Sequence, residues 1–459
     1  MAARAVLHRV PGRAGRLVAV VVCALVLCAR GASAAPKFQA VGETSVGYTD
    51  NIQSAPDHPI PGQVPKEPGA FALLSPGVVL AVANPTTVQR FSYTYLYSLF
   101  FSKFSASSSS NQIDYHGFFD LSPRTSLLLG ATAVQSNTYS SVLLTAPAAG
   151  LVNAMPPGGG SFLGATADEM LSFDMAPGWR WWEGASMTLQ TPVFGTVAPE
   201  TLEPAGRIGI ERSFVEDAVG VEGRVDYAVI RNSLLPNGAP AGVQLQLVAG
   251  GVGQWRHDWG RYFTSRVEAG PVRLQRLNTD TGFWFPSIYG ILAYATEVGD
   301  AQLSYGHTLT TNPLLGQSLL VDEVRARGAL PLTKKGKLLL GGSLGYQNGR
   351  LLDSQSQLAA HVDAILADAA FGWQVIDELL LGVRYQHIQQ ISDVRTPPLP
   401  VSFARNAILL GATLKFPPES DMPHAYRAPL RVDRTDEIRD AVEPATPGMQ
   451  PPNSLGPGR

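Results

Sequence analysis

The chain has 459 residues, a formal net charge of −2 and a hydrophobic content of 45%. This near-neutral charge, without a basic patch, argues against a nucleic-acid-binding protein. Both cysteines, Cys23 and Cys28, lie near the start of the chain. Disulfide scaffolds, thiol chemistry and zinc–thiolate sites are therefore excluded from the rest of it.

The first 34 residues have the features of a secretory signal peptide. Basic residues precede the apolar run Leu17–Ala29, which is too short to span a bilayer comfortably. Ala32-Ser33-Ala34 provides a small-residue cleavage site. We expect an exported mature chain that begins near Ala35. The alternative is a lipoprotein anchored through Cys28, which the lack of small residues just before that cysteine disfavours.

Alternation with a period of two residues is the main structural signal. In Arg90–Phe101 (RFSYTYLYSLFF), most large apolar side chains fall on one parity and the small polar ones on the other, as in a strand with one apolar face. About eighteen such segments occur: Lys37–Tyr48, Gly69–Ala83, Arg90–Phe101, Asn111–Leu121, Thr125–Ser136, Met170–Trp182, Ala185–Val197, Glu203–Phe214, Gly220–Arg231, Val243–Arg256, Arg261–Leu277, Phe283–Thr296, Ala301–Thr311, Ser318–Leu332, Lys337–Gln347, Gln357–Trp373, Leu379–Gln390 and Phe403–Phe416. A soluble sandwich also alternates, so other features must decide.

The links between the segments alternate in length. Every second link is a short turn, such as Asn84–Thr87, whereas the others tend to be longer, such as Thr49–Pro68 and Asn137–Glu169. Outer-membrane barrels have short periplasmic turns and longer external loops. After the signal segment, no apolar run approaches the ~18 residues of a membrane helix. We therefore predict an all-β fold, a transmembrane antiparallel up-and-down β-barrel of about 18 strands, over residues 35–416.

Tryptophan positions support a bilayer-spanning barrel. A soluble sandwich would place tryptophans in the middle of strands, in its core, whereas a barrel collects aromatic residues at both membrane interfaces. The residues next to predicted short turns are Trp179, Trp181, Trp182, Trp255, Trp259 and Trp373, and Trp284 begins a strand after a loop.

The polar parity must line the lumen, because a charge on the lipid face would cost about 2–4 kcal/mol near the midplane. The predicted lumen residues carry both signs: Glu43, Arg90, Asp114, Arg207, Glu211, Glu222, Arg224, Asp226, Arg266, Glu268, Glu323, Arg325, Arg327, Asp363, Arg384 and Arg405. Any one of them could instead pair across strands and only support the wall. A wall of mixed sign favours a neutral or weakly charged cargo.

We predict no enzymatic activity, no metal site and no cofactor. The histidines are scattered, and the G-x-S-x-G motif of serine hydrolases does not occur. Asp114/His116 and His361/Asp363 lie two residues apart, which places both pairs on the lumen face in this interpretation. Such pairs arise easily by chance in a polar lumen, and no spacing typical of metal ligands is present.

The sequence also leads to predictions for the longest link, the C-terminal tail and the last strand. The long link Asn137–Glu169 is expected either to fold inward as a constriction or to lie over the mouth. Residues 417–459, rich in proline and mixed charge, predict a disordered periplasmic tail that could dock a periplasmic partner. The last strand, with Gly411, Leu414 and Phe416, is similar to the C-terminal signal that the barrel-assembly machinery reads, although Leu409 departs from it.

The end of the first strand reads Val46-Gly47-Tyr48-Thr49-Asp50-Asn51-Ile52. This motif and the whole-chain layout resemble a family of outer-membrane barrels encoded with exopolysaccharide-export systems of Gram-negative bacteria. The motif also suits a simple exit into a turn, because Asp and Asn bond their own backbone there. The resemblance implies a conduit for a polymer made by a Wzx/Wzy-type pathway, working beside a periplasmic polysaccharide-export protein.

These observations lead to one expectation and two alternatives. We expect a barrel in the lipid bilayer of the cell outer membrane that exports a polysaccharide. The first alternative is a passive porin for small polar solutes. The second is a plugged barrel that serves as an anchor or adhesin, with its function in the loops.

Overall fold

The structure is a computed structural model, and it describes residues 36–52, 54–59, 65–136, 161–193, 200–234, 240–279, 281–296, 299–312, 317–333, 337–352, 358–393, 402–418 and 422. The predicted signal peptide, most of the predicted tail and residues 137–160 of the long link lie outside the described residues. Within the described residues, no helix is long and apolar enough to cross a membrane.

Eighteen strands make up almost all of the described chain. Their bounds are β1 Lys37–Thr49, β2 Gly69–Asn84, β3 Thr87–Phe100, β4 Ser108–Ser122, β5 Thr125–Ser136, β6 Ser161–Ala176, β7 Trp179–Val193, β8 Glu200–Ser213, β9 Asp217–Leu234, β10 Pro240–Asp258, β11 Phe263–Arg276, β12 Thr281–Thr296, β13 Gly299–Asn312, β14 Gln317–Pro331, β15 Leu338–Leu352, β16 Leu358–Ile376, β17 Leu379–Ser392 and β18 Phe403–Phe416. A 3₁₀ turn, η1 (Phe104–Ala106), precedes β4.

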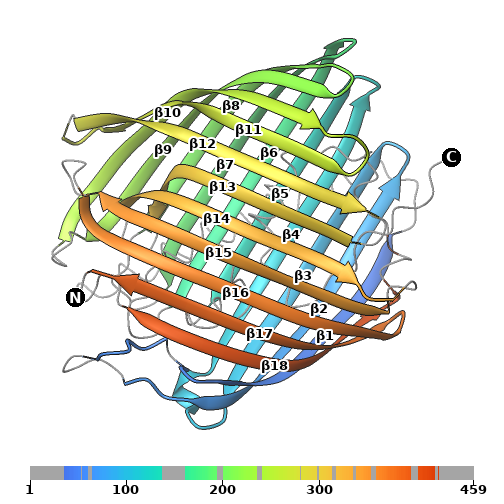
Figure 1. Cartoon of the computed structure of the whole chain (residues 1–459), viewed down its shortest axis with the longest axis vertical. Coiled ribbons are helices and arrows are strands. Elements are labelled where there is room, and N and C mark those ends of the chain that lie inside the picture. Colours follow the sequence, from blue (N-terminus) through green and yellow to red (C-terminus); the bar gives the residue numbers. More distant parts are fainter. Residues whose placement is uncertain are drawn as a thin grey trace, which may run out of the picture.

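The strands form one closed antiparallel barrel (Figure 1). Each strand pairs with its neighbours in the chain, and β1 closes the ring by pairing with β18 from Ala40↔Phe416 to Thr49↔Ala407. Closure gives every strand a partner on both sides, which is the condition for strands to cross a bilayer. The predicted fold class, an antiparallel transmembrane barrel of about 18 strands, is confirmed.

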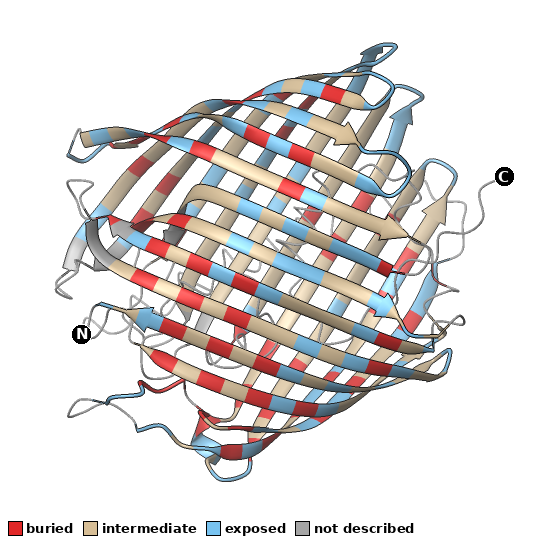
Figure 2. Ribbon diagram, viewed as in Figure 1, coloured by how far each residue is buried: buried red, intermediate tan, exposed pale blue. Residues whose placement is uncertain are grey.

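The inner face is identified by a side chain that reaches over intervening strands. Arg224 on β9 donates to the Ser287 hydroxyl on β12, past β10 and β11. Such a bond spans neighbours only on the concave side of the wall. Since side chains alternate across each strand, the register then assigns every paired residue to the lumen or to the outside. Figure 2 shows buried and exposed residues alternating along the strands.

The opening stretch of β3 follows its predicted alternation. Ser92, Thr94 and Ser98 face inward with Asp114, the residue opposite Ser92. The outward residues are Phe91, Tyr93, Tyr95, Tyr97 and Leu99. Leu96, on the polar parity, is buried. The outward face of β3 is therefore the apolar wall that the sequence indicates.

An exposed apolar band surrounds the barrel. Its large members include Val46, Leu74, Ile208, Val221, Leu303, Leu344, Leu410 and Leu414. At the short-turn end, aromatic residues border this band, among them Trp179, Trp255, Trp373 and Phe416. Arg212 lies 5.3 Å from the Trp179 ring centroid, a cation–π contact suited to an interface.

Two sequence predictions in this region were wrong. The turn between β6 and β7 is Pro177-Gly178, not Glu183-Gly184, and Gly178 has φ +76°, a conformation that favours glycine. Trp182 belongs to the lumen face and is buried, not part of the girdle. A Cβ on Gly209, opposite Trp182, would lie 2.3 Å from the indole ring, so glycine there makes room for it.

Candidate functional site in the lumen

The register places all but one of the predicted lumen residues on the inner face. The inward set comprises Glu43, Arg90, Asp114, Arg207, Glu211, Glu222, Arg224, Asp226, Arg266, Glu268, Glu323, Arg325, Arg327, Arg384 and Arg405. The exception is Asp363, which the register places on the outward face with Tyr346 and Asn348. The prediction that Asp363 lines the lumen was wrong, and so was that of the His361/Asp363 pair.

Ion pairs between residues two apart on one strand are a repeated feature of this wall. Arg266 pairs with Glu268 on β11, and Arg325 pairs with Glu323 on β14. Arg266 and Glu268 are both nearly buried, with 8% of each side chain exposed. Opposite charges at i and i+2 lie on the same face of a strand. Because each pair contains one positive and one negative charge, the pairs make the wall polar without giving it a net charge of one sign.

Hydrogen bonds also hold single carboxylates in place. Asp114 on β4 accepts from Thr132 Oγ1 at 3.0 Å, from Gln112 Nε2 at 3.0 Å and from Ser92 Oγ at 3.3 Å. On β9, Glu222 accepts from Gln254 Nε2 at 2.9 Å. Donors on the same strand and on neighbouring strands therefore fix the orientation of these carboxylates.

A recess in the lumen wall gathers charges from three strands. Glu43 on β1, Asp368 on β16 and Arg384 on β17 line a pocket of about 250 Å³ together with Ser45 and Ser343. Arg384 Nε donates to Asp368 Oδ2 at 2.5 Å. The recess combines two carboxylates, a guanidinium and hydroxyl groups, which is chemistry for hydrogen bonding to polar solutes.

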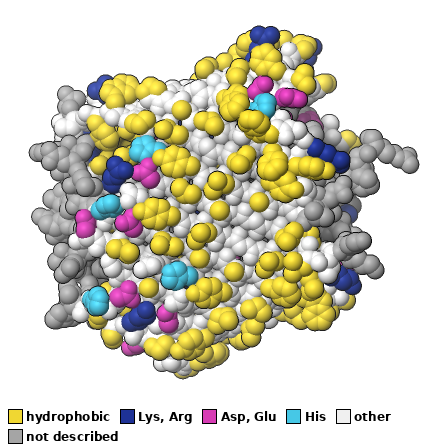
Figure 3. Space-filling model, in the orientation of Figure 1, with side chains coloured by type: hydrophobic (Ala, Val, Ile, Leu, Met, Phe, Trp, Pro, Cys, Tyr) yellow, Lys and Arg dark blue, Asp and Glu magenta, His cyan; other side chains and the backbone are white. Residues whose placement is uncertain are grey.

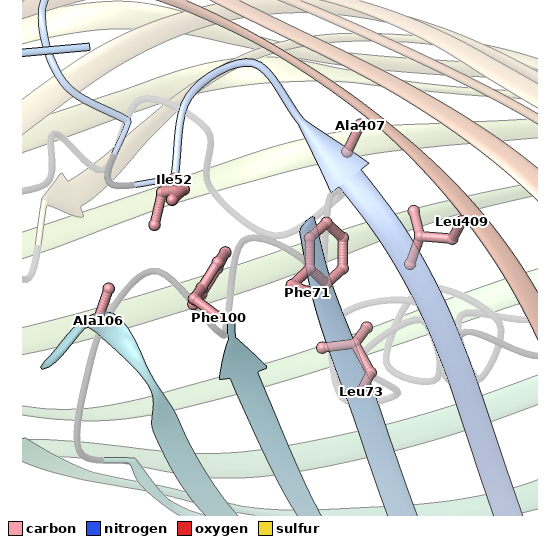
Figure 4. Packing of buried hydrophobic residues seen from close by; sticks show 7 residues of the cluster. All are labelled: Ile52, Phe71, Leu73, Phe100, Ala106, Ala407 and Leu409. Carbon is pink, nitrogen blue, oxygen red and sulfur yellow. The ribbon is translucent and has the colours of Figure 1, made fainter. Parts of the chain in front are cut away.

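The first long loop folds inward just after β1. Ile52 is buried with Phe71, Leu73, Phe100 and Leu409, lumen-facing residues of β2, β3 and β18 (Figure 4). Apolar burial of this kind contributes about 1.5–3 kcal/mol for one fully buried side chain. The loop is therefore attached to the lumen wall near the long-loop mouth.

Asn51 fastens this loop with its side-chain amide. Its Nδ2 donates to the carbonyls of Ala55 at 2.8 Å and Ala404 at 3.0 Å, and its Oδ1 accepts from the Ala55 amide at 2.7 Å. Arg405, which is 2% exposed, donates to Ser54 Oγ at 3.3 Å. The Asp50-Asn51-Ile52 motif is thus an anchor for the loop, where the sequence alone suggested a turn exit.

Asp50 ties the same motif to the last strand. Its two carboxylate oxygens accept from the backbone amide and the Nδ2 of Asn406, both at 2.7 Å, and Lys66 Nζ lies 3.6 Å away. Partial burial alone raises the pKa of Asp50, but the bonds from Asn406 and the charge of Lys66 outweigh it. The pKa of Asp50 therefore lies below its usual value of 3.8.

The outer ends of β13 and β14 also turn into the lumen. The β12–β13 ladder stops at Ile288↔His307, although both strands continue beyond it, and the end of β13 bends away from β12 (Figure 1). Beyond this point, Leu309 and Leu320 pack on a cluster that includes the lumen residue Leu274. This hairpin end covers part of the lumen face of β10–β12.

A polar bond secures the hairpin end. Ser318 Oγ donates to Gln246 Oε1 at 2.6 Å, a contact from β14 to β10. Both residues are buried. Together with the first loop, the hairpin end narrows the long-loop mouth from two sides of the wall.

The start of the C-terminal tail enters the opposite mouth. Gln39 Nε2 donates to the carbonyl of Pro417 at 2.8 Å. Met422 is buried against Val79, Ala81 and Val41, on the inner face of β1 and β2. Sequence reasoning missed this contact, because a lone methionine in a proline-rich tail carries no periodic signal.

The closed barrel, its outward apolar band and its aromatic edge place the chain in an outer membrane. It has the fold of an outer-membrane β-barrel. Among the described residues, no group of three or more His, Cys, Asp or Glu side chains is arranged to hold a metal ion.

Comparisons with known proteins give the following similarities. No protein-family model and no curated protein matches the sequence. Among solved structures, the chain is similar to OccK2 (OpdF) from Pseudomonas aeruginosa in complex with glucuronate, with 11% identity and a TM-score of 0.43 over 83% of this chain and 98% of that chain. It is also similar to the outer membrane protein OpdK from Pseudomonas aeruginosa, with 10% identity and a TM-score of 0.41 over 83% and 99%. A third is the ferric-catecholate import receptor Fiu from E. coli K12, with 10% identity and a TM-score of 0.41 over 83% and 82%.

Proposed function

We propose that this barrel is a channel for small polar solutes across the outer membrane. The observation that carries the proposal is the lumen wall, where both signs of charge are paired or hydrogen-bonded in fixed directions, as in Arg266–Glu268 and Asp368–Arg384. Such a wall offers donors and acceptors to a polar solute without strongly favouring either ionic sign. A neutral or weakly charged solute fits it best.

The narrowing of the lumen supports small solutes over a wide conduit. At the long-loop mouth, Ile52 and the Leu309–Leu320 hairpin end occupy the lumen face. At the other mouth, Met422 lies against the wall. These elements leave less cross-section than an empty barrel of this strand number would enclose.

Export of a polysaccharide is the second candidate function. The resemblance of the Val46–Ile52 motif supports it, and a hydrated sugar chain would also suit a wall of mixed sign. In that function a periplasmic export protein would meet the short-turn end of the barrel, where the tail begins.

Permeation measurements separate these functions. Liposomes that contain the purified barrel should swell in solutions of monosaccharides and more slowly as the sugar grows. Failure of even the smallest sugar to enter would contradict a channel and favour a plugged anchor or adhesin. For export, the cell-based test is a deletion strain, which must lose its surface polysaccharide if the second candidate is right.

A further inference from the structure

A row of polar side chains crosses the outward face of the barrel near its long-loop end. We call it the outer polar belt, and its members are Tyr305, His307, Asp322, Tyr346, Asn348, Arg350, His361, Asp363, Tyr385, His387 and Asn406. The register puts them on the face that also carries Leu303, Leu344 and Leu410, away from the lumen. Figure 3 shows histidine, acidic and basic side chains gathered at this end of the surface over β13–β18.

The belt begins on β13 and β14 around one carboxylate. Asp322 Oδ1 lies 2.6 Å from His307 Nδ1 and accepts from the Tyr305 hydroxyl at 3.2 Å. Its second oxygen accepts from Arg350 Nη2 of β15 at 2.8 Å. The carboxylate is thus held by donors from two neighbouring strands, and 24% of its side chain remains exposed.

The same arrangement recurs on β15 and β16. The Tyr346 hydroxyl donates to Asp363 Oδ1 at 2.7 Å, and Asn348 Nδ2 donates to the same oxygen at 2.8 Å. Asn348 lies directly opposite Asp363, as His307 lies opposite Asp322. In both cases the tyrosine is two residues before the residue opposite the carboxylate, so the side chains converge by the geometry of the ladder.

A third copy of this arrangement lies on β17 and β18. The Tyr385 hydroxyl donates to Asn406 Oδ1 at 2.8 Å, and His387 Nδ1 lies 2.8 Å from the same atom. Asn406 in turn donates to Asp50, which Lys66 approaches at 3.6 Å. Three consecutive hairpins therefore carry the same arrangement, and the third of them is hydrogen-bonded to the first long loop.

The position of the belt along the membrane normal identifies the layer of the membrane that it faces. Outward residues of β18 are apolar from Ile408 to Phe416, a rise of about 20 Å at ~3.3 Å per residue and a strand tilt of ~40°. The apolar band of an outer-membrane barrel is about 25 Å tall. The belt therefore begins where the hydrocarbon ends, at the headgroup layer of the outer leaflet.

The chemistry of the belt favours hydroxyl-rich headgroups. A phosphate site needs an excess of Arg or Lys, whereas here the carboxylates Asp322 and Asp363 offset the cation Arg350. Carboxylate, amide, imidazole and phenol groups side by side supply donors and acceptors in similar number, which matches sugar hydroxyls. The side chains of Arg350 and His361 are 44% and 40% exposed, so their free edges face outward.

We propose that the outer polar belt binds the sugar headgroup of an outer-leaflet glycolipid. The hydrogen bonds within the belt hold its groups in place before binding, so little ordering remains when a headgroup docks. The proposal does not depend on what passes through the lumen.

The short-turn edge of the same barrel supplies a matched control. There, on the outward face, Asp217 Oδ1 lies 2.9 Å from His257 Nδ1 and accepts from Trp255 Nε1 at 3.0 Å. This trio has the chemistry of the His307–Asp322 site but faces the other leaflet. Replacing His257 and Asp217 by leucine should leave glycolipid binding unchanged.

The test measures retention of a truncated lipopolysaccharide that keeps only its lipid-anchored inner sugars, by native mass spectrometry of the purified full barrel. The double variant His307→Leu and Asp322→Leu should bind about tenfold more weakly, because charge-assisted bonds are lost. His307→Asn, which keeps a donor near Nδ1, should restore most of the binding when Asp322 is present. Phosphatidylethanolamine should bind all variants equally.

Several outcomes would overturn the proposal. Unchanged binding by the belt variant would do so, and so would an equal loss in the Asp217/His257 control. Loss of binding after phosphate removal from the glycolipid would show that the belt recognises the phosphate groups and not the sugar hydroxyls. A change of oligomeric mass without loss of glycolipid would assign it to a second copy of the chain. If the double variant fails to insert, Tyr346→Phe, which removes one hydroxyl, must weaken binding severalfold.

Discussion

Tyr346 and Asp363 are joined by a hydrogen bond of 2.7 Å on the outward face of the barrel. The bond assigns Asp363 to the bilayer side, whereas Asp368, five residues later on the same strand, pairs with Arg384 in the lumen. One strand thus carries an acidic residue on each face, at different heights. Only the inward one, Asp368, faces the lumen.

Asp363→Asn is expected to leave the single-channel conductance and the ion selectivity unchanged. Asp368→Asn should shift the cation-to-anion permeability ratio roughly twofold toward anions, because it leaves the Arg384 charge uncompensated in the lumen. Planar-bilayer recordings of both variants check this. A selectivity shift in the Asp363 variant would contradict the assignment of faces.

Alternation predicted the two faces of the strands because the lipid face must be apolar wherever it meets hydrocarbon. The rule fails for Asp363 because this residue lies beyond the apolar band. At that position the outward face no longer meets hydrocarbon, so it tolerates polar side chains. In the same way, Glu183-Gly184 looked like a turn, although Glu183 faces outward and Gly184 inward within β7. Alternation alone gives the face on which a residue lies but not its position along the membrane normal.

The loop anchor and the inward hairpin end could not be predicted either, because both depend on contacts remote in sequence. Asn51 bonds the carbonyl of Ala404, and Ser318 bonds Gln246. Within the recess, Glu43, Asp368 and Arg384 come from both ends of the chain, and only the closure of β1 on β18 brings them together. The sequence predicted that the lumen wall is polar, but it did not predict which of its charged side chains lie next to one another.

Asn51→Ala should destabilise the barrel by about 1–3 kcal/mol, because it removes the side-chain partner of the buried Ala55 amide and carbonyl and a bond to the Ala404 carbonyl. Urea unfolding in lipid vesicles, followed by tryptophan fluorescence, measures the change. Asn84→Ala is the control, since Asn84 only bonds the exposed turn residue Thr86 and should cost less. Equal losses would show that Asn51 has no special anchoring role.

Stability should fall at acidic pH through Asp50. Its folded-state pKa is below the usual 3.8, so its ionised form is favoured in the folded barrel. This contribution is fully present above pH 3.8 and is lost as the pH falls through the folded-state pKa. Unfolding free energies measured from pH 6 down to pH 3 should therefore decline less steeply in Asp50→Asn than in the unmodified chain. Parallel curves would contradict this role of Asp50.

Releasing the β13–β14 hairpin end should widen the long-loop mouth. Leu320→Asp places a charge against the apolar cluster of Leu274 and Phe285, where an unpaired carboxylate is costly, so the hairpin end should leave the wall. Single-channel conductance and the swelling rate with larger sugars should both rise. Leu303→Asp, on the lipid face of the adjacent strand β13, controls for general destabilisation and should lower the yield of inserted barrel without raising its conductance. If Leu320→Asp inserts normally and its conductance equals that of the unmodified barrel, the hairpin end does not limit permeation, and the narrow part of the lumen must lie at the first loop or at the tail.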